Sequence, residues 1–172
     1  MGQKDQGLAK SRHRYHIIPR TLAFITNGDD VLLLKGSPQK RIWAGLYNGV
    51  GGHVEHGEDV YHAMLREIEE ETALPVDDLR LRVVGHIDAG DTSAGIMIFV
   101  FTAVSGTRTF KESDEGTLTW VPCQSLPIQD MVEDLPLLLP RILAMGPSDP
   151  PIFAAYHYDE ADHLQVTFAG VP

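Results

Sequence analysis

Residues 52–74, "GHVEHGEDVYHAMLREIEEETAL", place a glycine-rich loop directly before a segment with helical periodicity. Glu58 and Asp59 are acids of the kind favoured in a first helical turn, and Pro75 follows the last periodic residue, so a helix is predicted between them. Its apolar residues recur at the spacing of a buried face: Tyr61, Met64, Leu65 and Ile68. Because glycines let backbone groups approach a ligand, loop and helix are predicted to form a cup.

Four carboxylates crowd the last turns of this predicted helix, where the backbone carbonyl ends already concentrate negative potential. At about 100° per residue, Glu67, Glu70 and Glu71 share a sector beside the apolar stripe, whereas Glu69 lies on the far side. Like charges at such spacings repel, and a bound Mg²⁺ or Mn²⁺ would relieve the repulsion because these ions prefer hard oxygen ligands. A solvated acidic face without a metal is the alternative, and helix geometry alone favours it.

Segments of strand character surround this element. The expected strands lie within residues 20–36, 81–87, 95–104, 117–122 and 151–170, the first and last of these ranges being hairpins. A helical segment interrupted by prolines is expected within residues 129–146. No internal repeat or linker divides the chain, so residues 20–172 are predicted to form a single α/β/α domain with a mixed sheet, preceded by a flexible tail at residues 1–19.

Charge and composition limit the partners. The 172 residues carry a formal net charge of −10, which repels a nucleic-acid polymer but is compatible with a small phosphorylated substrate that arrives with a cation. No apolar run reaches the roughly 18 residues that cross a bilayer, and no signal core is seen, so a cytoplasmic location without membrane contact is expected. The single cysteine, Cys123, excludes an internal disulfide. A monomer and a homodimer are both compatible with the sequence.

Residues 52–74 resemble the Nudix box, G-x(5)-E-x(7)-R-E-U-x-E-E-x-G-U, in which U is apolar. The matching positions are Gly52, Glu58, Arg66, Glu67, Ile68, Glu70, Glu71 and Leu74. Ala73 stands where the family has glycine, at the helix end and away from the carboxylates. The resemblance implies a Nudix-like α/β/α sandwich with a catalytic loop-helix-loop. It also implies a metal-dependent hydrolase of nucleoside diphosphates linked to another moiety.

The resemblance further implies roles for individual residues. Glu67, Glu70 and Glu71 correspond to the metal ligands of the family, together with the carbonyl of Gly51. Arg66 corresponds to the residue that orients the glutamates. These five residues are therefore the candidate catalytic and metal-binding set.

A second segment, residues 112–122, resembles the loop that supplies a late glutamate in the family. That glutamate, a metal ligand or a general base, corresponds to Glu115, with Glu112 and Asp114 as alternatives. A carboxylate near the reacting water can take its proton before in-line attack on phosphorus. The general base is then either Glu67 or Glu115.

Residues outside the box bear on the substrate. Lys35 and Arg41 precede the glycine loop and are candidates to hold phosphate, although solvated loop cations are the more common finding. From residue 20 onward the chain also resembles the oxidised-purine nucleoside triphosphatases, the MutT homologues. In that subgroup an asparagine and an acid read the purine edge, and these correspond to Asn48 and Asp134. The alternatives are that Asn48 serves a turn and that Asp134 caps the next segment.

Two positions depart from that subgroup. Val132 stands where it has a stacking tryptophan, and Leu135 where it has a second aspartate. The leading hypothesis is a Mg²⁺-dependent hydrolase, with Mn²⁺ as a substitute, that cleaves a nucleoside triphosphate to a nucleoside monophosphate and pyrophosphate. The substrate would be 8-oxo-dGTP or another modified purine nucleotide. The alternatives are a Nudix hydrolase of ADP-ribose or a nucleotide sugar, and a non-catalytic nucleotide sensor.

Overall fold

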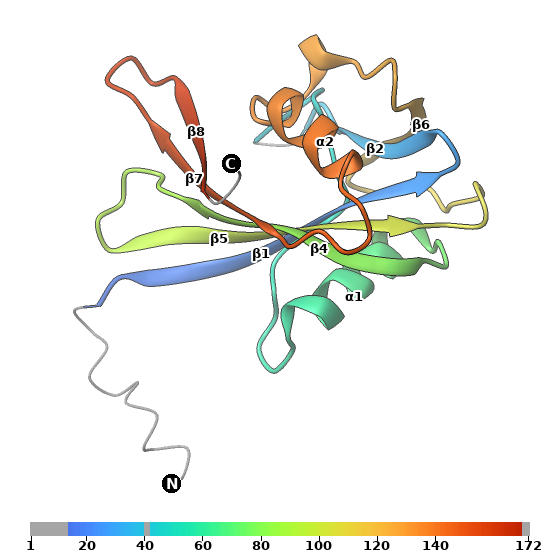
Figure 1. The fold of residues 1–172 in the computed structure, drawn as a ribbon, viewed down its shortest axis with the longest axis horizontal. Coiled ribbons are helices and arrows are strands. Elements are labelled where there is room, and N and C mark those ends of the chain that lie inside the picture. Colours follow the sequence, from blue (N-terminus) through green and yellow to red (C-terminus); the bar gives the residue numbers. More distant parts are fainter. Residues whose placement is uncertain (1–13, 40–41, 170–172) are drawn as a thin grey trace, which may run out of the picture.

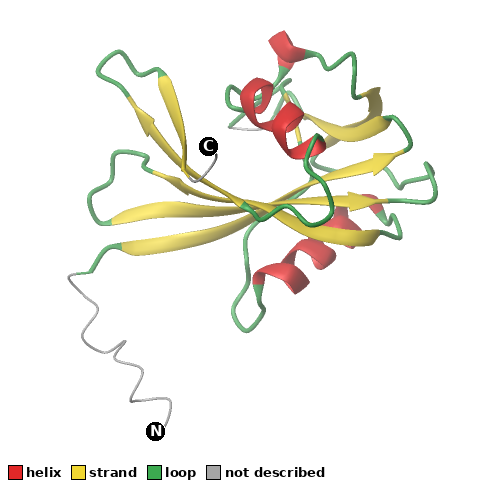
Figure 2. Cartoon of the chain, viewed as in Figure 1, coloured by secondary structure: helices red, strands yellow, loops and turns green. Residues whose placement is uncertain are grey.

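The computed structural model describes residues 14–39 and 42–169. The strands are β1 (His16–Asn27), β2 (Asp30–Gly36), β3 (Tyr47–Asn48), β4 (Asp77–Ile87), β5 (Ala94–Val104), β6 (Gly116–Pro122), β7 (Ile152–Tyr158) and β8 (Leu164–Ala169). The helices are α1 (Val60–Thr72) and α2 (Leu135–Leu143), with a 3₁₀ turn, η3 (Ile128–Asp130), before α2. Figure 1 shows α1 below the sheet and α2 above it, and Figure 2 shows the same layers by secondary structure. The predicted α/β/α sandwich is confirmed.

The sheet is mixed, as predicted. Its order is β3-β2-β1-β5-β4-β7-β8, and β6 pairs with β2 outside this path. The pairs β1–β5 and β4–β7 are parallel, and the other pairs are antiparallel. The predicted first hairpin is present, with Asn27 paired to Asp30 across a turn in which Gly28 has φ +61°.

The first strand begins before the predicted domain boundary. His16 pairs with Ala94, and the parallel register of β1 with β5 continues to Thr26. Residues 16–19 therefore belong to the sheet and not to the predicted tail, because their backbone groups bond to β5. Pro19 interrupts the apolar pattern of this segment and hides its strand character in the sequence. The remainder of the predicted tail, residues 1–13, lies outside the described residues.

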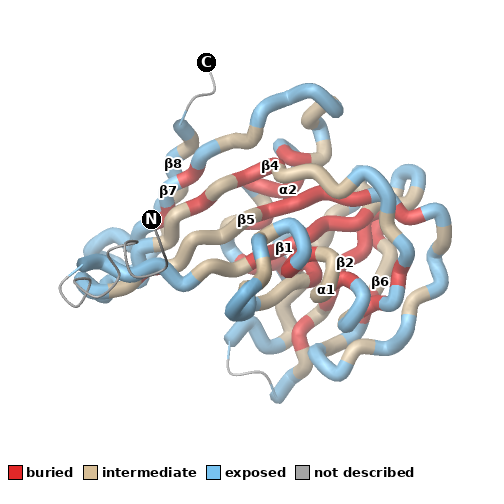
Figure 3. The backbone as a smooth tube through the Cα atoms, turned by 90° about the horizontal axis from the view of Figure 1, so that it is seen from below, coloured by how far each residue is buried: buried red, intermediate tan, exposed pale blue. Residues whose placement is uncertain are grey.

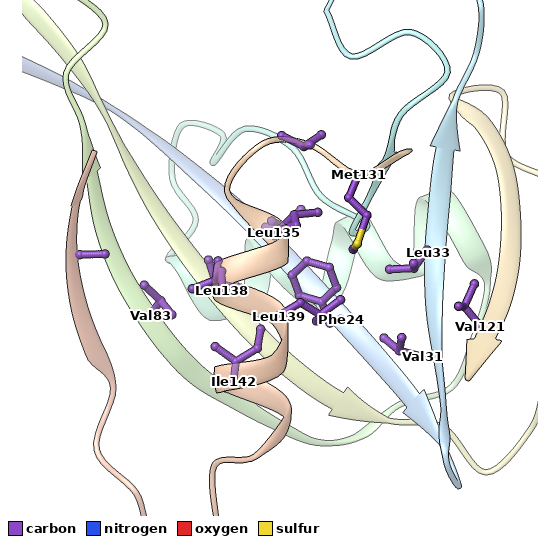
Figure 4. Close-up of a cluster of buried hydrophobic side chains, with 14 of the residues drawn as sticks. Phe24, Val31, Leu33, Val83, Val121, Met131, Leu135, Leu138, Leu139 and Ile142 are labelled. Atoms are coloured by element: carbon purple, nitrogen blue, oxygen red, sulfur yellow. The ribbon is translucent and has the colours of Figure 1, made fainter. Parts of the chain in front are cut away.

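Alternation along the strands divides the core between two faces. On β1, Leu22 and Phe24 pack on the α2 side, whereas Ala23 and Ile25 pack on the α1 side. Figure 3 shows the buried segments running through the middle of the sheet, and Figure 4 shows the α2 side chains facing Phe24, Val31 and Leu33. Each helix thus rests on its own apolar layer.

Helix α1 has well-defined ends. The Asp59 carboxylate accepts hydrogen bonds from the amides of Tyr61 (2.9 Å) and His62 (3.1 Å), so it is the N-cap. The helix ends at Ala73, whose φ is +52° and whose amide donates to the Glu69 carbonyl. This left-handed position favours glycine, the residue of the family motif. Ala73 adopts the same backbone geometry at a cost of about 1 kcal/mol.

The buried face of α1 differs from the predicted one. The buried residues are Ala63, Met64, Ile68 and Thr72. Tyr61 is 45% exposed, and Leu65 is only partly buried. The buried sector therefore extends toward Glu67, where the glycine-rich loop contacts the helix, whereas Tyr61 in the first turn stays exposed.

Helix α2 accommodates both prolines of the predicted segment. Pro136 lies in the first turn, where its missing N–H is not needed, and Pro140 lies inside the helix. The amide of Ala144 still bonds to the Pro140 carbonyl. Within residues 14–39 and 42–169, no helix is long and apolar enough to cross a membrane.

Candidate active site

The glycine-rich loop lies along β1. The amide of Ala23 donates to Val50 (2.7 Å), and the amide of Thr21 donates to the Gly52 carbonyl (2.9 Å). Because alternate carbonyls of an extended segment point to opposite sides, the Gly51 carbonyl between them faces away from β1. A Cβ at Gly51 would overlap the Thr21 carbonyl, so only glycine fits there. The loop thus presents the candidate carbonyl ligand.

Loop and helix meet at Glu67. A Cβ added at Gly52 would overlap the Glu67 carboxylate, which therefore lies directly against the loop backbone. The Glu67 side chain is only 13% exposed. Burial raises the pKa of Glu67, against the opposing effect of the neighbouring Arg66. The contact forms the cup that the sequence predicted.

Arg66 connects the acidic residues of this cup. Its Nε and Nη2 donate to Glu58 (3.2 and 2.8 Å), and Nη2 also donates to the His53 carbonyl (3.0 Å). Its Nη1 donates to Glu67 (2.9 Å) and to Glu70 (3.1 Å). These bonds raise the pKa of the guanidinium and lower the pKa of Glu58. All five N–H donors are used, so Arg66 orients two candidate ligands while Glu58 anchors it.

The remaining candidate ligands, Glu70, Glu71 and Glu115, differ in exposure and in position. Glu70 has a side chain that is 59% exposed, whereas the Oε2 atom of Glu71 is buried. Glu69 is exposed on the far side, as predicted. Glu115 precedes β6, and its carbonyl accepts the Ser37 amide (3.0 Å) at the end of β2.

Two candidate substrate residues lie on neighbouring strands. Lys35 on β2 pairs with Tyr47 on β3, and its ammonium lies 4.9 Å from the centre of the Tyr47 ring. The next residue, Asn48, pairs with Leu34, and its Oδ1 accepts the Gly49 amide (2.8 Å). The local bond to Gly49 matches the turn alternative for the Asn48 oxygen. Arg41 lies outside the described residues.

Asp134 approaches β3 through the segment before α2. Tyr47 and Met131 form a parallel bridge, and the Val132 amide donates to the Tyr47 carbonyl (3.0 Å). Asp134 occupies the N-cap position of α2, but its side chain makes no capping hydrogen bond. Burial raises the pKa of Asp134 to about 6, and the buried Tyr156 hydroxyl lies beside it without ordinary hydrogen-bond geometry. Asp134 is therefore a partly desolvated acid two residues after Val132, which bonds to the residue before Asn48.

The family model of the NUDIX domain matches residues 16–142. This chain belongs to the Nudix family. It is 34% identical over 129 residues to the oxidized purine nucleoside triphosphate hydrolase of Mus musculus, across 70% of this chain and 79% of that protein. It is 30% identical over 116 residues to the NAD-capped RNA hydrolase NudC of Pseudomonas aeruginosa strain LESB58, across 67% of this chain and 40% of that protein. The crystal structure of a MutT protein from Bacillus halodurans superposes with a TM-score of 0.73 at 24% identity, covering 90% of this chain and 99% of that one.

Membership makes this protein a hydrolase of phosphoric anhydrides, and Nudix hydrolases generally require a divalent metal. The donors in the cup fit such an ion, because carboxylate and carbonyl oxygens are its preferred ligands. Within the described part of the chain, no three acidic, histidine or cysteine side chains lie close enough to share an ion as they stand. Glu67 and Glu70 instead face Arg66. Rotation of these flexible side chains would be needed to bring them together.

Sequence reasoning missed one residue of this Nudix domain, Tyr156, which lies beside Asp134. It lies on β7, and both burial and the Asp134 charge raise the pKa of its hydroxyl. Ala154 and Tyr156 are the two buried residues of β7 and lie two positions apart. This alternation was the available signal, since inward-facing residues of a strand recur at every second position.

Proposed function

We propose that this Nudix hydrolase cleaves purine nucleoside triphosphates, oxidised purines among them, to nucleoside monophosphate and pyrophosphate with Mg²⁺. One observation carries the proposal: Asn48 leads directly through Gly49 and Val50 into the Gly51–Gly52 loop that holds Glu67. An extended chain advances roughly 3.3 Å per residue, so the candidate base-reading and phosphate-handling groups lie about 10 Å apart. A nucleoside triphosphate can span both.

The cup would carry the chemistry. Glu67, Glu70, Glu71 and the Gly51 carbonyl would hold Mg²⁺, or Mn²⁺ in its place. When bound, the ion offsets phosphate charge and lowers the pKa of a water molecule. Arg66 keeps the glutamates oriented through its hydrogen bonds.

A carboxylate of the chain takes the proton of the attacking water as the anhydride P–O bond breaks and pyrophosphate leaves with the bonding electrons. Glu67 and Glu115 are the two candidates for this general base. Burial of Glu67 supports its candidacy, because a raised pKa makes a carboxylate a better proton acceptor near neutral pH. Lys35 would approach the phosphates as a point charge.

The base would be read by Asn48 and Asp134. An amide offers both donors and an acceptor, and a carboxyl with a pKa of about 6 exists in both protonation states near neutral pH. The resemblance to the mouse oxidized purine nucleoside triphosphate hydrolase supports this choice of substrate. Val132 and Leu135 are 7% and 1% exposed and belong to the core, so neither offers a base a substantial surface.

A substrate panel tests the proposal. Canonical and 8-oxo (d)NTPs would be compared with ADP-ribose, a nucleotide sugar and NAD at matched Mg²⁺, and scored separately for pyrophosphate and phosphate. The expected result is pyrophosphate release with purine triphosphates favoured, and Mn²⁺ replacing Mg²⁺. Equal kcat/KM for all four bases would contradict base reading by Asn48 and Asp134. Release of phosphate would contradict the assigned bond.

A second candidate is hydrolysis of a dinucleotide pyrophosphate, which the likeness to NudC favours. The NAD and ADP-ribose arms of the panel distinguish it. A non-catalytic sensor is less well supported, because all the carboxylates of the Nudix box are present.

A further inference from the structure

The protein has two tryptophans, and the fold explains only one of them. Trp120 on β6 donates its indole N–H to the Arg108 carbonyl (3.0 Å), and the Arg108 guanidinium lies 5.1 Å from its ring centre. Trp43 is 47% exposed. Within residues 14–39 and 42–169, its indole has no hydrogen bond, ring contact or cation contact, and Trp43 belongs to neither hydrophobic cluster of the core.

The backbone at Trp43 makes its presence more unusual. Its φ is +60°, in the left-handed region that bulky residues rarely adopt. Glycine would satisfy this turn without strain, as Gly45 does two residues later with φ +74°. Strained residues of this kind cluster at ligand-binding sites, where function offsets the conformational cost.

Backbone hydrogen bonds connect the turn that contains Trp43 to the end of β2, next to Lys35. The Leu46 amide donates to the Trp43 carbonyl (3.1 Å), and the Gly36 amide donates to the Leu46 carbonyl (3.0 Å). Gly45 in turn donates to the Gly36 carbonyl (2.9 Å). Gly36 directly follows Lys35 and pairs with Gly116, the residue after Glu115. The turn is therefore held beside the backbone of Lys35, a candidate phosphate-binding residue, and of Glu115, a candidate catalytic residue.

On the other side of β3, residue 132 offers no aromatic surface. Val132, whose amide bonds to Tyr47, is 7% exposed and packs into the core. Nucleobases gain roughly ten- to hundredfold in affinity by stacking on an aromatic side chain, since every base has a π face. An exposed indole on an anchored turn is well suited to that role.

We propose that Trp43 is the side chain on which the nucleobase of the substrate stacks, and that it determines specificity together with Asn48. This inference rests on the proposed function. A purine is favoured over a pyrimidine because it covers more of the indole. Strain at φ +60° is the conformational cost of presenting the ring to the ligand.

Fluorescence tests the contact without turnover. In a Trp120→Phe variant, Trp43 is the sole tryptophan. Titration with dGTP in EDTA is expected to quench its emission saturably, whereas pyrophosphate alone should not. In the reciprocal Trp43→Phe variant, dGTP should leave the Trp120 emission unchanged. No quenching of Trp43 at saturating dGTP would overturn the inference.

Kinetics separate stacking from a structural role. Trp43→Ala should raise KM for dGTP about 10- to 100-fold with kcat within about threefold, and Trp43→Phe should recover part of the loss. Trp43→Gly should raise KM similarly while its melting temperature stays at or above that of the wild type, because glycine relieves the backbone. Phe153→Ala, which removes a 57%-exposed aromatic on β7, is the control and should leave KM unchanged.

The outcomes of these experiments distinguish a failure of the stacking role of Trp43 from a failure of the proposed hydrolase function. An unchanged KM in Trp43→Ala, or a lower melting temperature in Trp43→Gly, would overturn the stacking role while the hydrolase function stands. If the wild type hydrolyses no triphosphate, the proposed function fails. The fluorescence titration with dGTP then decides by itself whether Trp43 contacts a base.

Discussion

Helices α1 and α2 cover opposite faces of one sheet (Figure 1), yet only α1 has a charged side chain within its buried side. Helix α2 buries aliphatic residues alone: Leu135, Leu138, Leu139 and Ile142. Helix α1 places Glu67, 13% exposed, between Ala63 and Met64 at about 100° per residue. An apolar residue at this position would add to the hydrophobic core. With Glu67 there instead, α1 contributes less apolar contact to the core. The two helices should therefore respond differently to substitution.

The largest expected effect is on activity, from the acidic residues of α1. Glu70→Gln and Glu71→Gln should each lower kcat by at least about 10- to 100-fold, because each removes a proposed carboxylate ligand of the metal while its shape is kept. The melting temperature should change little, since one charge is removed from a crowded acidic edge. Steady-state kinetics and circular dichroism melts would measure both.

Glu69→Gln is the matched control, because Glu69 is exposed on the far side of the same helix. It should retain wild-type activity. Wild-type turnover in both Glu70→Gln and Glu71→Gln would contradict the assignment of these residues.

Helix α2 should show the opposite response. Leu138→Ala removes a side chain that is 1% exposed and should lower the free energy of unfolding by about 2–5 kcal/mol. The kcat per folded molecule should be unchanged. Leu137→Ala, at a neighbouring residue that is 54% exposed, should cost about 0.5 kcal/mol or less in denaturant unfolding. A large loss of kcat with intact stability in Leu138→Ala would break the comparison.

A smaller effect is expected where the loop meets α1. In Gly52→Ala the new Cβ overlaps the Glu67 carboxylate, which must turn away. Displacement of about 1 Å at a reacting centre can cost about 10²-fold, so kcat/KM should fall by about 10- to 100-fold while the protein stays folded. Gly106→Ala, where a Cβ meets nothing within 4 Å, should have no effect. Equal kinetics for the two variants would argue against the importance of this contact.

The smallest expected effect is a pH dependence on the α2 side. The folded-state pKa of Asp134, about 6, exceeds its ordinary value of 3.8, so its stabilising contribution is fully present below pH 3.8 and lost as pH rises through 6. Allowing for partial exposure, the buried charge costs roughly 1 kcal/mol above pH 7. Asp134→Asn should therefore be more stable than wild type at pH 8 by about that amount, with no difference near pH 4. Chemical unfolding across this range would test it, and a difference that grows toward low pH would contradict it.

Local signals in the sequence predicted the elements whose ends are marked by capping or turn residues. Asp59 and Pro75 bracket α1, and Asn27-Gly28 marks the first hairpin, because caps and turns depend on residues next to each other in the chain. Glu69 was placed outside the acidic set by helical geometry alone. Such features follow from periods and caps and need no knowledge of tertiary contacts.

Features that depend on distant contacts were missed or wrong. Tyr61 was predicted to be buried, but it lies in the first turn of α1 and is 45% exposed. Residues 16–19 were assigned to the tail, although β5, far along the chain, pairs with them. The proximity of Tyr156 to Asp134 likewise depends on how β7 meets α2. No local pattern encodes these pairings.

The central claim, that the acidic edge of α1 holds a divalent cation, is most directly tested by Mn²⁺ binding. The free Mn²⁺ signal in electron paramagnetic resonance would be titrated against wild type, Glu69→Gln and Glu71→Gln without substrate. The account predicts equal affinity for wild type and Glu69→Gln, and affinity at least about tenfold weaker for Glu71→Gln. Equal Mn²⁺ affinity in all three proteins would contradict it.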